Sequence, residues 1–337
     1  MADGLSIAHV DSEISFRGGQ EALLQLAIGL RGLGHWQVIA CPARSELAAR
    51  ASKEGFPVVE LNRLRAALRA HSVQIVHSHS GRAHNKAWIA KSGLHIRFIA
   101  TRHVAFEPRF KVVHWLKYGV ACDRIIAVSQ AVREKLIQSS VPASKIEVIY
   151  TGVRLPETLP SPPERVAARA RFGFTERDFV LGHLGAFSRE KGQDVAVEAL
   201  KFLPRDVRLV LAGANPPRFE DSRVVSPGYV EDRRAFFAAL DLFVMPSRSE
   251  AWGLAALEAM AHGVPVVASA VGGLKEIVED GVSGWLVPSD DARALGSAVE
   301  QARPIVREFG ARSRVRAAKF SVEETVRKTE AVYLGDK

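Results

Sequence analysis

The stretch that decides the fold is PSRSEAWGLAALEAMAHGVPVVA, residues 246–268, which places the carboxylates of Glu250 and Glu258 on either side of a strand-to-helix junction. The apolar run at 242–245 predicts a buried strand that ends just before this stretch. The Ala- and Leu-rich run at 254–261 predicts a helix. A strand followed directly by a helix is the unit from which parallel α/β sheets are built.

The predicted helix start is a candidate ligand site. Backbone N–H groups around Gly253 and Leu254 lie at the helix N-terminus, a position that favours a phosphate group. Glu258 lies about one turn into the helix, where its carboxylate can accept hydrogen bonds from both hydroxyls of a ribose. Glu250 precedes the helix and faces whatever the phosphates carry. The junction therefore predicts a nucleotide site.

Short apolar runs alternate with helix-period segments along the chain, which predicts parallel sheets covered by helices on both faces. The length of 337 residues favours two domains over one, because single cores stop growing near roughly 250–300 residues. Strands are expected in the first half at residues 7–10, 37–40, 58–61, 74–78, 98–101, 124–128 and 147–150. Strands are expected in the second half at residues 179–182, 208–212, 224–225, 241–245, 264–268 and 284–287.

The fold class expected from this alternation is α/β, with two doubly wound Rossmann-like domains. The N-terminal domain is assigned to residues 1–153, and the Pro-rich, charged segment 154–171 to an interdomain linker. The C-terminal domain is assigned to residues 172–320, and residues 321–337 to a final helix.

The net charge of +9 is confined to one half of the chain. Residues 1–152 contain 20 Lys and Arg against 11 Asp and Glu, whereas residues 153–337 contain 26 of each. A basic half suits an anionic membrane surface, an acidic substrate or nucleic acid. Nucleic acid is disfavoured, because no helix-turn-helix, zinc-finger, RRM or KH pattern occurs.

The sequence also indicates a compartment. There is no run of 18 apolar residues and no charged segment followed by an apolar one at the N-terminus, so we expect neither a transmembrane helix nor a secretory signal. Two cysteines, Cys41 and Cys122, argue against a disulfide framework. We expect a cytoplasmic protein, which can be peripheral at the inner face of the plasma membrane.

Residues 246–268 resemble the E-x7-E signature of glycosyltransferase family 4, whose members are retaining enzymes with the GT-B fold, two Rossmann-like domains facing across a cleft. The segments around the two glutamates match as well, namely Pro246-Ser247, Gly253, Glu258-Ala259-Met260 and Gly263-Val264-Pro265-Val266-Val267. The alternative is a solvated helix that happens to carry two glutamates. The resemblance implies that the last helix packs back on the N-terminal domain, which holds the acceptor.

The resemblance implies a donor site in the second domain. Glu250 would contact the donor sugar or phosphate, and Lys191, near Gly185, would neutralise the diphosphate. The family's Arg after this glycine is Ala186 here, so Arg189, Arg17 or Arg248 must supply the second charge, with Arg189 slightly favoured. The donor-binding residues expected from the resemblance are Gly18, Gly19, Gly185, Arg189, Tyr229, Val230, Gly253, Leu254 and Glu258. A second turn, Gly272-Gly273, resembles one near the donor, and Glu276 after it either meets the donor or caps its helix.

The histidines lie mainly in the first half. His103, after a Thr-containing strand, matches the family's active-site histidine, and its implied role is to hydrogen-bond the sugar at the reacting centre. His77 and His79 share one face of a strand, a spacing that can chelate a metal. A satisfied pair at a strand end is favoured, because no third ligand with zinc-site spacing follows. The expected acceptor contacts are Arg17, His77, His79, Arg82 and Arg102, with His84 extending this surface.

The resemblance implies transfer of a sugar from a UDP- or GDP-sugar to a glycan or lipid-linked acceptor, as in lipopolysaccharide-type cell-envelope synthesis. Metal independence is expected, because no Asp-x-Asp motif occurs, and no cofactor is expected. Dinucleotide fingerprints, Walker loops and serine-hydrolase elbows are absent too. The alternatives are a sugar-nucleotide epimerase or a phosphorylase of the same fold, or a non-catalytic nucleotide-sugar-binding protein.

Overall fold

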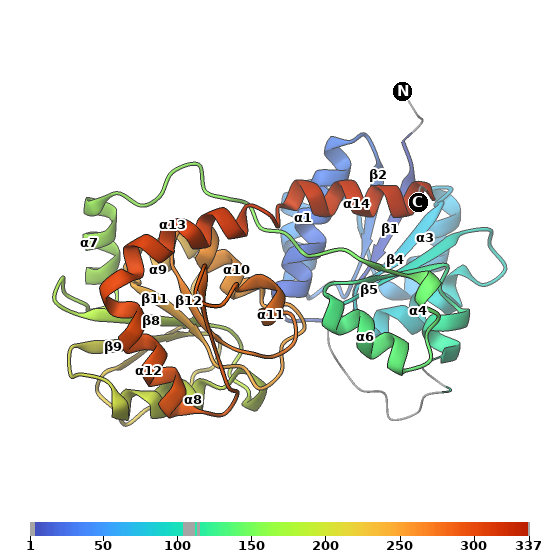
Figure 1. Ribbon diagram of the computed structural model, residues 1–337. Coiled ribbons are helices and arrows are strands. Elements are labelled where there is room, and N and C mark those ends of the chain that lie inside the picture. Colours follow the sequence, from blue (N-terminus) through green and yellow to red (C-terminus); the bar gives the residue numbers. More distant parts are fainter. Residues whose placement is uncertain (1–3, 104–111, 113–114, 336–337) are drawn as a thin grey trace. The chain divides into compact units, whose positions relative to one another are not determined.

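The computed structural model describes residues 4–103, 112 and 115–335. The chain forms two compact units (Figure 1). Unit 1 comprises Met1–Gly152 and Val322–Lys337, and unit 2 comprises Val153–Ser321. In the part of the chain that is described, no helix combines the length and the apolar character needed to cross a bilayer.

Unit 1 is built on a parallel sheet of seven strands in the order β3-β2-β1-β4-β5-β6-β7. Its strands are β1 (Ser6–Val10), β2 (Trp36–Ala40), β3 (Val58–Val59), β4 (Ile75–Ser78), β5 (Arg97–Arg102), β6 (Arg124–Ala127) and β7 (Ile146–Val148). The central strands are largely buried, as expected for strands that helices cover on both faces. The central pair places His9 of β1 directly beside His77 of β4.

The helices of unit 1 follow its strands in alternation. They are α1 (Gly18–Gly32), α2 (Glu46–Lys53), α3 (Leu64–Ala70), α4 (Gly81–Lys91), α6 (Gln130–Gln138) and α14 (Val322–Leu334), with short turns η1 (Leu61–Arg63), η2 (Trp115–Val120) and η3 (Ala143–Lys145). Side-chain caps fix several starts: the Ser45 and Ser129 hydroxyls accept from the backbone N–H of Ala48 and Val132, at α2 and α6.

The C-terminal helix α14 belongs to unit 1, where it packs across α1 (Figure 1). Val322, Val326 and Tyr333 enter the same core as Ile7 of β1 and Leu30 of α1. The close approach requires Gly29 on α1, since a Cβ there would lie 2.3 Å from Val326 Cγ2. The Arg97 guanidinium donates to the backbone oxygens of Val332 and Tyr333, which caps the end of the helix.

Unit 2 repeats the architecture with a parallel sheet of six strands in the order β10-β9-β8-β11-β12-β13. The strands are β8 (Phe179–Leu184), β9 (Val207–Ala212), β10 (Val224–Gly228), β11 (Leu242–Met245), β12 (Val266–Ser269) and β13 (Gly284–Val287). The helices are α7 (Pro162–Arg171), α8 (Gln193–Ala199), α9 (Arg233–Ala239), α10 (Leu254–Ala261), α11 (Leu274–Ile277), α12 (Ala292–Ala302) and α13 (Val306–Ala317), with turns η4 (Arg189–Lys191), η5 (Leu200–Phe202) and η6 (Arg303–Ile305).

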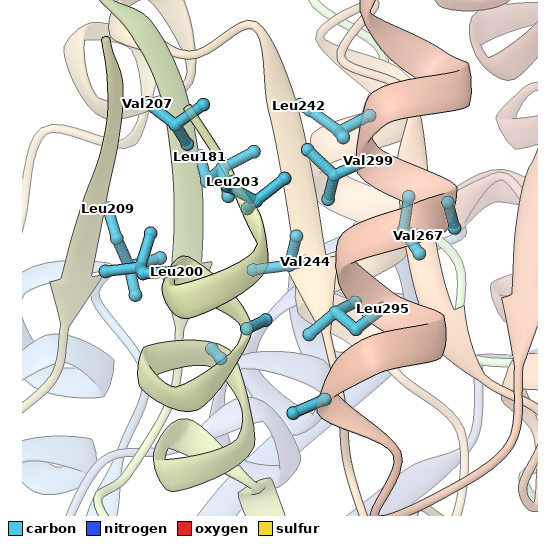
Figure 2. Close-up of a cluster of buried hydrophobic side chains, with 14 of the residues drawn as sticks. Leu181, Leu200, Leu203, Val207, Leu209, Leu242, Val244, Val267, Leu295 and Val299 are labelled. Atoms are coloured by element: carbon cyan, nitrogen blue, oxygen red, sulfur yellow. The ribbon is translucent and has the colours of Figure 1, made fainter. Parts of the chain in front are cut away.

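The core of unit 2 lies between its sheet and the helices α8 and α12. Figure 2 shows Leu200 and Leu203 together with buried side chains of the sheet such as Leu181 and Val244, and with Leu295 and Val299 reaching in from α12. These side chains are nearly or completely buried, so each contributes roughly 1.5–3 kcal/mol to the burial of apolar surface. This packing fixes the ends of β8 and β11, which carry the loops of the candidate site.

The expected linker differs from the structure in its second half. Residues 162–171, assigned from sequence to the linker, form helix α7 within unit 2. Pro162 and Pro163 occupy the first turn, where proline is compatible with a helix, and Ser161 forms a capping box with Glu164. Two arginines of α7, Arg165 and Arg169, bind the Asp241 carboxylate at 2.6 and 2.5 Å. These contacts attach the helix to unit 2.

Candidate functional site

Lys191 and Glu250 form an ion pair in unit 2. Lys191 ends the turn η4 after β8, and Glu250 lies in the loop between β11 and α10. The Lys191 Nζ and Glu250 Oε2 atoms are 2.6 Å apart, and the side chains are 28% and 11% exposed. The two residues expected to meet the donor's diphosphate and sugar therefore lie in contact, because they follow β8 and β11, which are neighbouring strands of the sheet.

The turn Gly272-Gly273 determines where Glu250 lies. The Gly273 N–H donates to the Glu250 carbonyl oxygen at 3.2 Å. Gly272 has a φ of +50°. A Cβ on Gly272 would lie 1.7 Å from the same oxygen. Only glycine fits this conformation and this distance, so the turn packs directly on the backbone of Glu250. Glu276, for which the sequence left two roles open, lies in the first turn of α11 after this turn.

The helix α10 begins at Leu254, as predicted, and Glu258 is half-buried on it. Gly253 precedes the helix with a φ of +107°. A Cβ on Gly253 would lie 2.6 Å from Leu274 Cδ2, so glycine is required by packing as well as by conformation. The helix N-terminus thus follows Glu250 closely, as the nucleotide-site prediction requires.

The three candidates for the second cation differ in their surroundings. The Arg248 guanidinium is held by Asp194 at 2.7 Å and by Asp290 at 2.5 Å, and it also donates to the Arg189 carbonyl oxygen. Its charge is therefore already neutralised within unit 2. The Arg189 side chain is exposed, and in the described parts of the chain no carboxylate pairs with it. Arg17 is exposed in unit 1.

His183 of β8 is a residue that sequence reasoning missed. It is fully buried, and its Nδ1 lies 3.0 Å from the Val244 carbonyl oxygen, so Nδ1 carries the proton. Its Nε2 is buried, and no described residue forms a hydrogen bond with it. A Cβ on Gly185 would lie 3.4 Å from this Nε2 and 3.9 Å from Lys191 Cδ. Burial lowers the pKa of His183 to about 4. The sequence signal that could have identified His183 is a histidine within the otherwise apolar strand β8.

The remaining donor candidates lie at the end of β10. Gly228 has a φ of +81°, and its carbonyl oxygen accepts from the Gly213 N–H at 2.9 Å. Val230 is buried, whereas the Tyr229 ring is exposed and lies 5.9 Å from the Arg233 guanidinium carbon. This loop offers backbone groups beside an exposed aromatic ring, as expected for a loop beneath a base.

In unit 1, the Gly18-Gly19 turn lies against His103. A Cβ on Gly19 would lie 3.7 Å from His103 Cγ, so the structure brings these two predicted residues together. Gln20 fixes the turn: its Oε1 accepts from the Arg17 N–H at 3.1 Å, and its Nε2 donates to the buried Asp11 carboxylate. Burial raises the pKa of Asp11.

His103 lies beside a small cavity. Burial lowers the pKa of His103 to about 4, so the ring is neutral at pH 7, and its Nε2 has no hydrogen-bond partner among the residues that the structure describes. The cavity offers about 20 Å³, enough for one water molecule. Its polar lining consists of His79, His103, Thr101, Thr151, Thr325 and Thr329. The C-terminal helix therefore contributes two hydroxyl side chains to the surroundings of His103.

His77 and His79 form part of a buried cluster with a third ring, that of His9. Spacing in sequence gave no third histidine near this pair, because His9 comes from β1, which is distant in sequence and pairs with β4 in the sheet. His9 Nδ1 lies 3.1 Å from His79 Nε2, and His77 contacts Tyr333 Oη at 2.5 Å and Thr101 Oγ1 at 2.7 Å. The three rings are shielded from solvent.

Of the residues expected to contact the acceptor, some are exposed and others are buried. Arg17 and Arg82 are exposed, at the α1 start and on α4. Arg102 is instead buried, and its guanidinium donates to Tyr118 Oη at 3.0 Å. His84 does not extend the surface, because its ring is buried against Phe98 and Tyr118. Arg102 is the last residue of β5, and His84 lies on the side of α4 that packs against Phe98, so both side chains are directed into unit 1.

Two Rossmann-like units, the second with a Lys–Glu pair ahead of a helix that carries another glutamate, define a protein of the GT-B class. Residues 178–303 match the family described as Glycosyl transferases group 1, and residues 16–156 match the one described as Glycosyltransferase Family 4. The chain therefore belongs to glycosyltransferase family 4. The predicted resemblance to this family is confirmed, and the roles of Glu250 and Glu258 stay predictions.

Named relatives are D-inositol 3-phosphate glycosyltransferases. That of Mycobacterium sp. (strain KMS) is 33% identical over 248 residues, which are 64% of this chain and 56% of that protein. That of Mycolicibacterium smegmatis is 32% identical over 286 residues, 75% of this chain and 65% of that protein. The matches thus span little more than half to two thirds of the length of these relatives.

Solved structures share the fold. HepE of Anabaena, determined in complex with UDP and glucose, superposes with a TM-score of 0.89 at 22% identity, over 98% of this chain and 100% of that one. WaaG, a glycosyltransferase involved in lipopolysaccharide biosynthesis, superposes with a TM-score of 0.77 at 17% identity, over 98% and 100%. The expected GT-B fold of two Rossmann-like domains is confirmed.

Proposed function

We propose that this protein transfers a glycosyl group from a nucleoside diphosphate sugar to an anionic acceptor, with retention of configuration and without a metal ion. The observation that carries this proposal is the Lys191–Glu250 pair at 2.6 Å, placed just before the α10 N-terminus. It supplies one cation for a diphosphate, one carboxylate for a sugar, and N–H groups for a phosphate. Membership in glycosyltransferase family 4 supports the reaction class.

The chemistry follows from charge development. As the glycosidic bond to the β-phosphate breaks, negative charge builds on the departing diphosphate. Lys191 and the N–H groups around Gly253 stabilise this charge more in the transition state than in the ground state, which lowers the barrier. Glu258 anchors the ribose, and the acceptor hydroxyl attacks from the face that the diphosphate leaves and passes its proton to the departing phosphate oxygen. His103, which is neutral and whose Nε2 has no partner in the described part of the chain, orients the sugar through a hydrogen bond.

The donor is proposed to be a UDP- or GDP-sugar, with UDP favoured because HepE was determined with UDP and with UDP-glucose. A thermal-shift panel of UDP, GDP, ADP and their sugars tests this step, because a ligand that binds the folded state raises the melting temperature. Stabilisation by one nucleotide series supports the proposal. Failure of every nucleotide to raise the melting temperature contradicts it.

The acceptor is proposed to carry phosphate. Residues 61–106 contain eight Lys and Arg and neither Asp nor Glu, a basic stretch that suits an anionic substrate. The inositol phosphate named in the relatives' activity is one such acceptor, and a phosphorylated lipid-linked glycan of the lipopolysaccharide type is another. Incubation of each with the donor, followed by mass spectrometry and NMR of the anomeric centre, identifies acceptor and stereochemistry. Donor isomerisation or phosphate-dependent cleavage without a glycoside product would assign the chain to another reaction class.

A peripheral membrane site is proposed on α4 and η2. Trp88 and Ile89 on α4 are 41% and 71% exposed, and Trp115 and Leu116 on η2 are also exposed. Lys86 and Arg82 add positive charge on the same helix. Exposed Trp beside cations suits the interface of an anionic membrane, which we take to be the inner face of the plasma membrane.

Liposome co-sedimentation tests whether the exposed residues of α4 and η2 bind a membrane. We expect binding to vesicles of phosphatidylglycerol and phosphatidylcholine at low salt, weaker binding as salt rises, and none to phosphatidylcholine alone. Ile89→Ser should weaken binding, whereas Val315→Ser, an equally exposed apolar residue of unit 2, should not. Equal loss in both variants, or no binding at low salt, contradicts the assignment.

A further inference from the structure

The histidine cluster of unit 1 has the geometry of a metal site. His9 and His77 are direct neighbours on β1 and β4, and His79 lies two residues beyond His77 and so faces the same side. The rings are 0%, 0% and 5% exposed. One ring nitrogen from each residue lies within 4.8 Å of the other two.

The hydrogen bonds of His9 settle its tautomer. The Gln37 Nε2 donates to the Ala27 carbonyl oxygen at 2.9 Å, which places Gln37 Oε1, an acceptor, toward His9. His9 Nε2, at 2.9 Å from Oε1, must therefore carry the proton. The His9 Nδ1 lone pair is left facing His79 Nε2 at 3.1 Å, with a single proton between these two nitrogens.

We propose that His9, His77 and His79 bind one divalent transition-metal ion of the Zn²⁺ type, through His9 Nδ1, His79 Nε2 and one ring nitrogen of His77. The ion replaces the proton between His9 and His79, and His79 takes its other neutral tautomer. No net proton is released. Three uncharged imidazoles without a carboxylate select Zn²⁺, Co²⁺, Ni²⁺ or Cu²⁺ over Mg²⁺ or Ca²⁺. His79 also lines the water-sized cavity, which leaves room for a fourth ligand.

The surroundings of the cluster suit such an ion. Gln37 orients His9 in the manner of an outer-shell partner, and His77 keeps either its Tyr333 or its Thr101 hydrogen bond when its other nitrogen binds the metal. Burial lowers the pKa of His77 and of His79 well below the usual value, so protons do not compete for these rings at neutral pH. The ion would link β1 to β4 and, when His77 keeps its bond to Tyr333, to α14.

In the proposed transfer reaction Lys191, and not a metal ion, supplies the positive charge for the donor's diphosphate. Metal binding by the three histidines can therefore be tested without measuring turnover. The full chain is stripped with a chelator and titrated with Zn²⁺ by equilibrium dialysis and with Co²⁺ by visible absorption. We expect one ion per chain, a Co²⁺ spectrum of the tetrahedral type, and a raised melting temperature. Absence of stoichiometric binding, or only the weak spectrum of octahedral surface-bound Co²⁺, overturns the proposal.

Variants locate the ion. His79→Gln should abolish stoichiometric binding, and Gln37→Leu, which removes only the outer-shell contact, should weaken it by about 10–100-fold. His95→Gln, which removes an exposed histidine of the same unit, should leave it unchanged. Loss of binding in His95→Gln, or binding unchanged in His79→Gln, overturns the assignment. The melting temperature with UDP, measured in chelator, keeps the outcome separate from that of the proposed function.

Discussion

The Lys191 ammonium group lies 2.6 Å from the Glu250 carboxylate, so the cation that should meet a donor's diphosphate already has an anionic partner. A bound diphosphate must compete with this carboxylate for Lys191. The pair therefore couples sugar binding by Glu250 to diphosphate binding by Lys191. Any change that weakens the ion pair leaves Lys191 available to the phosphate.

Substitutions at the two positions should have opposite effects on UDP binding. Lys191→Ala removes a charge-assisted contact and should weaken UDP by about 10–100-fold. Glu250→Gln removes the competitor, so UDP should bind about three- to fivefold more tightly, for a pair worth roughly 1 kcal/mol, while turnover falls by roughly 100-fold. Calorimetric titration measures the UDP affinity, and a steady-state assay measures the turnover. Equal weakening of UDP in both variants would contradict competition for Lys191.

The second cation should be Arg189 and not Arg248. Arg189→Ala should weaken UDP binding, because this exposed guanidinium is available to a phosphate. Arg248→Ala should leave UDP affinity nearly unchanged and lower the melting temperature, by about 2–4 °C for each 1 kcal/mol lost with its contacts to Asp194 and Asp290. Calorimetric titration with UDP and thermal unfolding of both variants show which arginine binds the phosphate. A loss of UDP affinity confined to Arg248→Ala would reverse the assignment.

Local sequence signals sufficed for much of this architecture. Helix α10 begins and ends where the apolar run predicts, at Leu254–Ala261, and the strand positions follow the apolar runs. Helix α7 was not predicted, because proline pairs mark both linkers and helix starts, and only the contacts with Asp241 show which applies. The contacts of Arg248 and the meeting of His9 with His79 join residues distant in sequence. Strand order brings such residues together, and no short window of sequence encodes it.

The Gly272-Gly273 turn should be needed for turnover as well as for stability. Gly272→Ala places a methyl group where the Glu250 carbonyl oxygen lies, and relief of this overlap must displace Glu250. Gly281→Ala is the matched control, since its φ of +69° is also positive and, apart from its chain neighbours, no atom of the described residues lies within 4 Å of its Cβ position. Both should lose roughly 1–2 kcal/mol to backbone strain. Gly272→Ala should lose more, and it alone should lower kcat per folded molecule. Equal kcat values would show that the turn does not position Glu250.

Unit 2 should lose stability in weak acid through His183. Burial lowers the pKa of this histidine in the folded protein to about 4, against about 6.5 when unfolded. The unfolded state therefore binds a proton first as the pH falls. Stability is complete above about pH 6.5, declines between about pH 6.5 and 4, and changes no further below that range on account of this group. The full loss is on the order of 3 kcal/mol.

His183→Asn isolates this contribution, because its side-chain N–H can replace Nδ1–H as donor to the Val244 carbonyl oxygen and it does not titrate. Urea unfolding of both proteins between pH 7.5 and 4.5 measures the difference. At pH 7.5 the variant should be the less stable of the two, since it leaves part of a buried ring's volume unfilled. As the pH falls, the wild type should lose more stability than the variant, so that the two curves converge. Parallel curves across this range would mean that His183 is not held neutral by burial, and the unsatisfied Nε2 beneath Gly185 would then require another explanation.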